Sequence, residues 1–140
     1  MKHAVLLMIP ALLVSAASWA AGPPKTRLMD HSTDLLIEEK AALAILGENI
    51  PARVWKIYPA SKYGFVSQVE GGMKGTTCVV TARVMLLPLT PTMKAVLFRP
   101  EKTATAFDSA ANSSTDACKA MARDKLKEAT QAVVSALVKT

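Results

Sequence analysis

The most regular hydrophobic pattern in the chain is the alternation across residues 76–87, TTCVVTARVMLL. Every second position from 78 to 86 is apolar, whereas the positions between them mix threonine and arginine with Val79 and Met85. An apolar period of two is typical of a half-buried strand, and the β-branched residues suit a pleated surface. Glycines before the run and Pro88 after it make a helix the weaker interpretation. We therefore expect a strand with one core face, formed by Cys78, Val80, Ala82, Val84 and Leu86.

A second pattern, with helical periodicity, covers residues 115–139. Apolar residues from Cys118 to Leu137 recur on one arc of a helical wheel, and Thr130 falls with the polar residues opposite. Ser114 or Thr115 is the expected N-cap, and Asp116 suits the positive end of the helix dipole. The pattern predicts a long amphipathic helix with one core face.

The two cysteines lie on the core faces of these two elements, each near the element's start. A Cys78–Cys118 disulfide is the expected pairing, and it requires the strand and the helix to run in roughly the same direction. Metal binding and redox chemistry are the weaker alternatives, because the chain has no CxxC and His31 is the only histidine after residue 3.

Weaker patterns complete the predicted element list. Ser32, Thr33 and Asp34 resemble a helix start, and Gly47 a helix stop. The alternation across 53–58 predicts a strand with Trp55 and Ile57 directed inward. Further strands are expected at 65–70, 93–99 and, more weakly, 103–107, with a hairpin turn at 71–75.

This order predicts an α+β fold. We expect an antiparallel sheet of four to five strands, flanked in sequence by an N-terminal and a C-terminal helix that both cover one face. No repeat or second domain is apparent in the sequence.

The first 20 residues have the composition of an export signal: Lys2 begins it, an apolar segment follows, and small residues stand at Ser18 and Ala20. We expect cleavage before Ala21, a mobile lead-in over 21–31 and a single domain over 32–140. The expected location is the periplasm or the exterior, which an even number of cysteines also favours. We expect no transmembrane segment in the mature chain.

The formal net charge is +6. Excess positive charge permits contact with an anionic envelope component or an acidic protein partner, although solubility alone explains a charge of this size. We expect no nucleic-acid partner, and the oligomeric state is open.

No pattern of catalytic residues stands out. His31 lies next to Ser32 and Asp34, but a helix cap explains that cluster more simply than a nucleophile and its base. The acidic residues show no spacing typical of a carboxylate pair. We expect no catalytic residues, no metal and no cofactor.

Two groups of residues are candidates for recognition. One is the pair of tyrosines with a lysine around residues 59–62, namely Tyr58, Lys62 and Tyr63. The other is a basic stripe at helical spacing, which a solvated helix face also explains, namely Lys119, Arg123 and Lys127.

The leading hypothesis is an exported, non-enzymatic binding protein of the cell envelope. An inhibitor or immunity-type protein, with 59–64 as the contact loop, is the alternative within the binding class. An envelope hydrolase that uses carboxylates is the alternative from a different class.

Overall fold

The computed structural model describes residues 25–92 and 99–138. The described chain has an α+β fold with a mixed four-stranded sheet, three helices and one disulfide. The predicted export signal, and most of the strand predicted at 93–99, lie outside the described residues.

The sheet has the order β1-β2-β3-β4, with strands β1 (Leu28–Asp30), β2 (Tyr63–Lys74), β3 (Thr77–Pro88) and β4 (Lys102–Ala110). β2, β3 and β4 form an antiparallel meander, but β1 pairs with β2 in parallel, so the expectation of a purely antiparallel sheet is wrong. A parallel neighbour needs a crossover connection, and here α1 and α2 supply it.

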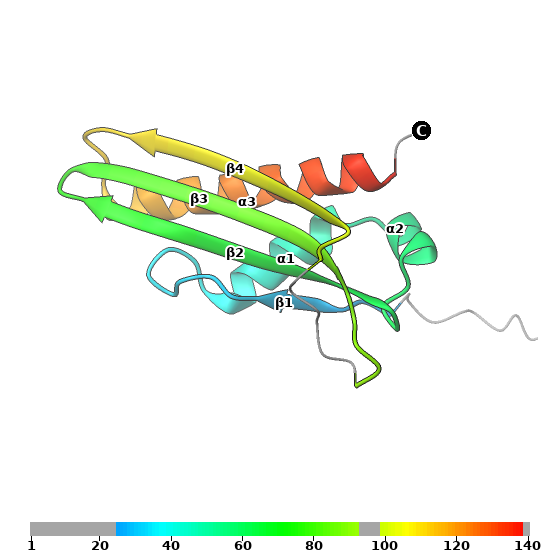
Figure 1. Cartoon of the computed structure of the whole chain (residues 1–140). Helices are drawn as coiled ribbons and strands as arrows, with labels where there is room; N and C mark the ends of the chain where they lie inside the picture. The colour runs from blue at the N-terminus through cyan, green and yellow to red at the C-terminus, as the bar shows by residue number, and fades with distance from the viewer. Residues whose placement is uncertain (1–24, 93–98, 139–140) are drawn as a thin grey trace, which may run out of the picture.

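Helices α1 (Glu39–Asn49) and α3 (Thr115–Leu137) lie side by side behind the sheet (Figure 1). α3 packs mainly on β3 and β4, whereas α1 packs on β1 and against α3. The short α2 (Ala52–Ile57) lies at one end of the sheet.

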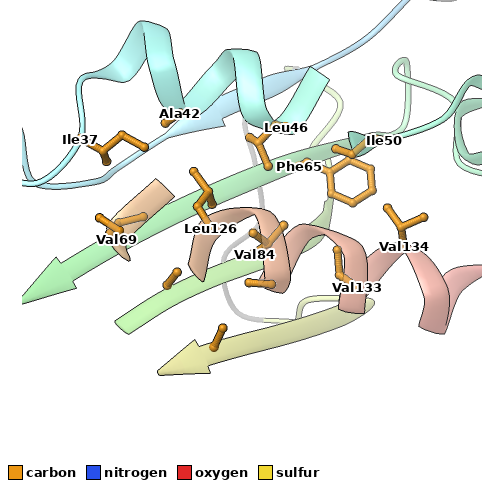
Figure 2. Packing of buried hydrophobic residues seen from close by; sticks show 14 of the residues in the cluster. Ile37, Ala42, Leu46, Ile50, Phe65, Val69, Val84, Leu126, Val133 and Val134 are labelled. Atoms are coloured by element: carbon orange, nitrogen blue, oxygen red, sulfur yellow. The ribbon is translucent and has the colours of Figure 1, made fainter. Parts of the chain in front are cut away.

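The alternation across β3 correctly predicted five buried side chains, and Leu87, at an intervening position, is buried as well. Cys78, Val80, Ala82, Val84 and Leu86 are all inaccessible to solvent. They meet the apolar face of α3 and, from β2 and α1, the side chains of Phe65, Val69 and Leu46 (Figure 2).

Thr130 contradicts the predicted helix wheel, because it is fully buried on the core side of α3. Its hydroxyl donates to the carbonyl oxygen of Leu126 at 2.7 Å, one turn earlier. That bond satisfies the hydroxyl within the helix, so the polar side chain can be buried without an unpaired donor.

The segment predicted as a strand at 53–58 is the helix α2. Pro51 precedes the first turn in an extended conformation, which suits a helix start. Val54 and Trp55 are buried from adjacent positions, and Ile57, expected inward, is 57% exposed. A period of two cannot be distinguished from a helix over so few residues.

The first long helix begins at Glu39 and not near residue 32. Serine and aspartate favour turns as well as helix caps, and here a turn over residues 34–36, in which the amide of Leu36 donates to the carbonyl oxygen of Thr33 at 3.0 Å, precedes the helix. The helix also continues past Gly47 to Asn49, and Pro51 shortly after restricts further continuation.

The hairpin predicted at 71–75 is tighter than expected, because β2 extends to Lys74 and pairs it with Thr77. Gly75, at φ +62°, occupies the first turn position, where two-residue hairpins use glycine. Gly71 is required by crowding, since a Cβ there would lie 2.1 Å from the carbonyl oxygen of Val79.

Candidate functional site

A pocket of about 390 Å³ lies at the end of the molecule that carries the disulfide. Three segments far apart in sequence enclose it: the turn before α1, the last residues of β2 and the first turn of α3. Figure 1 shows the β2–β3 hairpin, the start of α3 and the turn before α1 at the same end of the sheet. The volume falls within the range of small-molecule sites.

The disulfide holds two of these segments together. Cys78, at the start of β3, is bonded to Cys118, in the first turn of α3, as the sequence predicted. Both elements consequently run in the same direction from this end (Figure 1). Ser114 caps the helix by accepting a hydrogen bond from the amide of Ala117 at 3.1 Å.

The turn before α1 is fastened to β2 by hydrogen bonds that continue the parallel pairing of β1. The amides of His31 and Thr33 donate to the carbonyl oxygens of Ser67 and Val69. The hydroxyl of Ser32 accepts from the amide of Val69 at 2.9 Å and donates to Asp30 at 2.6 Å. Ser32 is therefore a structural residue, and not the helix cap that the sequence suggested.

These hydrogen bonds hold the turn in a position where Leu35 lies outside the core. The next two residues, Leu36 and Ile37, are buried, but Leu35 is 79% exposed and borders the pocket. Met73 and Cys118 supply further apolar lining. An exposed leucine alone is ordinary, whereas one beside an apolar pocket extends the surface that a ligand could cover.

The charged side chains that line the pocket among the described residues are both lysines, Lys74 from β2 and Lys119 from α3. The first turn of α3, whose end of the helix dipole is positive, also borders it through Thr115. Asp116 offsets part of this charge, although it does not line the pocket. The site thus combines an apolar lining with positive charge.

The structure separates the predicted basic stripe. Lys119 lines the pocket, but Arg123 and Lys127 are exposed further along α3 and do not. Lys125, between them, forms an ion pair with Glu128 at 2.6 Å and one with Asp108 of β4 at 3.5 Å. The hydrogen bond to Glu128 raises the pKa of Lys125, and both carboxylates act in the same direction.

The predicted aromatic candidates lie at the opposite end of the sheet. Tyr58, at the end of α2, packs edge to face against Tyr63, at the start of β2, with ring centroids 5.3 Å apart. Lys62 and Tyr63 also line a second pocket of about 390 Å³. The three residues are therefore neighbours, as their spacing suggested, and their role in recognition remains a prediction.

Within the described parts of the chain, no group of three or more histidine, cysteine, aspartate or glutamate residues is arranged to hold a metal ion. No helix in those parts is both long and apolar enough to span a bilayer.

Sequence reasoning missed Leu35, Met73 and Lys74 as site residues. Leu35 was assigned to a helix, and Lys74 to a turn, so neither was connected with the start of α3. The long-range bond between the cysteines was the available signal, because it brings the hairpin and the start of α3 to the same end.

No known protein-family model and no curated protein matches the sequence significantly. One solved structure shows a similar fold. PelC from Paraburkholderia phytofirmans, in a point variant described as a dodecamer, has a TM-score of 0.50 at 13% identity, over 79% of this chain and 89% of that one.

A second PelC dodecamer structure from the same organism has a TM-score of 0.43 at 12% identity, over 81% of this chain and 90% of that one. A candidate lipoprotein from Caulobacter crescentus has a TM-score of 0.37 at 13% identity, over 77% and 83% of the two chains. The PelC match with a TM-score of 0.50 shows a similar fold and, at 13% identity, nothing about activity.

Proposed function

We propose that this protein is an exported binding protein of the cell envelope that holds its ligand in the pocket beside the disulfide. The observation that carries the proposal is the position of Leu35, 79% exposed at the rim of an apolar pocket that two lysines also line. Burial of that side chain by a ligand would be favourable, because apolar surface would leave water.

The proposed location rests on two other observations. The first 20 residues have the pattern of an export signal, and both cysteines are joined in a disulfide, which persists in oxidising compartments.

A photo-reactive residue in the pocket would test the binding role in cells. We would place p-benzoylphenylalanine at position 35 and, as a matched control, at position 57, where Ile57 is also exposed but lies outside the pocket. After irradiation, the proposal predicts an adduct at position 35 and none at position 57. Equal labelling, or no adduct at position 35, would contradict binding at this pocket.

Cell fractionation with intact-mass measurement tests the location separately. We expect the protein in the envelope fraction, with the N-terminal segment removed and a mass lower by two hydrogen atoms than after reduction. Cytoplasmic protein with free thiols would contradict export, whatever the labelling result. Light scattering on the purified chain would show whether it assembles, as the PelC of similar fold does.

A further inference from the structure

We propose that the ligand of the disulfide-end pocket is a single-chain fatty carboxylate, with its hydrocarbon chain against Leu35 and Met73 and its head group between Lys74 and Lys119. This inference rests on the proposed binding role and names the ligand class. It follows from the combination of apolar lining, paired positive charge and limited volume at one site.

The lining favours a hydrocarbon chain over a polar ligand. Leu35 presents an exposed alkyl side chain to the pocket, the buried Leu36 and the partly buried Met73 add apolar lining, and the half-cystine Cys118 is also apolar. Each methylene group of a ligand that is buried there contributes favourably through the hydrophobic effect. Methionine adapts its shape to irregular apolar partners, which suits a chain of variable conformation.

The charged residues favour an anionic head group. Lys74 of β2 and Lys119 of α3 both line the pocket and both are exposed, so an anion bound there would lie near two positive charges. No acidic residue of the described chain lines this pocket to compete with it. A carboxylate accepts hydrogen bonds from two lysines at once, and charge-assisted bonds of this kind are strong.

The backbone at the pocket permits close approach. Gly72, in β2, has no neighbouring atom within 4 Å of the position that a Cβ would occupy. Its φ of +133° accounts for the glycine, and the absence of a side chain leaves the backbone at the pocket accessible to a ligand. The volume of about 390 Å³ lies at the lower end of the small-molecule range, so one chain with a small head group fits better than a two-chain lipid.

Isothermal titration calorimetry of the disulfide-bonded mature chain with laurate, below its micelle concentration, tests the proposal. We expect one saturable site. Dodecyltrimethylammonium, which has the same chain and the opposite charge, should bind at least about tenfold more weakly. Lysophosphatidylglycerol with a similar chain tests a phosphate head group in place of the carboxylate, and it should also bind more weakly than laurate.

Variants locate the site. The double variant Lys74→Glu/Lys119→Glu should weaken laurate binding by about tenfold or more, since two attractions become repulsions. Lys127→Glu, on the same helix outside the pocket, should leave the affinity within about twofold. Leu35→Ser should weaken binding severalfold, whereas Ile57→Ser should not. All of these positions are exposed, so each variant should remain folded, and circular dichroism would verify this.

Several results would overturn the proposal: no laurate binding by the folded wild-type chain, equal binding of the cationic amphiphile, tighter binding of the lysophospholipid, or equal losses in the pocket and control variants. An adduct at position 35 that contains a protein, without laurate binding, would refute the fatty carboxylate and retain the binding role. Absence of any adduct at position 35 would refute the binding role itself.

Discussion

The recognition candidates at the two ends of the sheet differ in their internal contacts. At the disulfide end, Leu35 is 79% exposed beside a pocket that two lysines line. At the other end, Tyr58 and Tyr63 pack edge to face and cover part of each other's apolar surface. Aromatic residues beside a loop suggested a recognition surface from sequence; that role is still a prediction, and the two rings are in contact with each other.

Residue type beside a loop is therefore not enough to identify a binding surface. Aromatic pairs gain energy from their own contact, so their presence near a loop does not require a ligand. Leu35, which the hydrogen-bonded turn holds outside the core, gains no energy from an aromatic contact of this kind. The following predictions test whether the two ends are independent, from the largest expected effect to the smallest.

Val84→Asp should unfold the domain, so that both ends of the sheet lose their structure together. Val84 is fully buried in the middle of β3, and a carboxylate there would have no partner. We expect a loss of about 4 kcal/mol or more in the free energy of unfolding, measured in urea. Arg83→Asp, on the exposed side of the same strand, should change it little. The reverse ranking would show that the faces of β3 are assigned wrongly.

Removal of the disulfide by Cys78→Ala/Cys118→Ala should destabilise the fold by about 2–4 kcal/mol. The bond closes a sequence separation of 40 and joins the start of β3 to the start of α3. Hydrogen exchange should therefore accelerate more at the hairpin and the first turn of α3 than at α2. Uniform acceleration along the chain would contradict a local role at the pocket end.

Ser32→Ala should loosen the turn that carries Leu35. The hydroxyl of Ser32 is the acceptor for the amide of Val69, and its loss leaves that donor unsatisfied. We expect a loss of about 1–3 kcal/mol and faster exchange of the Val69 amide. Ser61→Ala, exposed at the opposite end, is the matched control. Unchanged protection of the Val69 amide would refute the assigned role.

A double-mutant cycle with Tyr58→Leu and Tyr63→Leu should measure the pairing at the opposite end. We expect a coupling energy of about 0.5–1.5 kcal/mol from the edge-to-face contact. The same variants should leave laurate binding unchanged, since neither residue lines the disulfide-end pocket. A coupling near zero would mean that the rings are free for a partner, and the contrast between the two ends would be lost.

The smallest effect concerns Lys125, whose pKa is raised above 10.5, first by its hydrogen bond to Glu128. A raised folded-state pKa contributes stability that is fully present below the unfolded-state value and is lost as the pH rises through the folded-state value. Lys125→Met should thus lower the Tm slightly at neutral pH, and the difference from wild type should shrink above pH 10.5. Lys127→Met is the control, and a difference independent of pH would contradict the assignment.

The sequence by itself determined the α+β class, the long third helix, the buried face of β3 and the pairing of the cysteines. These features depend on long regular patterns. Buried and exposed positions alternate along the twelve residues of β3 and recur with a helical period along the 23 residues of α3. Local pattern and tertiary burial agree along most of both elements, with Thr130 of α3 as an exception, so the prediction of the two core faces holds.

The tertiary structure alone decided the parallel β1, the helical α2 and the pocket. Strand β1 has three residues and α2 has six, which is too short for a period to be recognised. The pocket depends on three segments distant in sequence, and its members were assigned separately to a helix, a turn and a solvated face. The predicted disulfide was the one feature of the sequence that linked segments this far apart, and it indicated the end of the molecule where the candidate site lies.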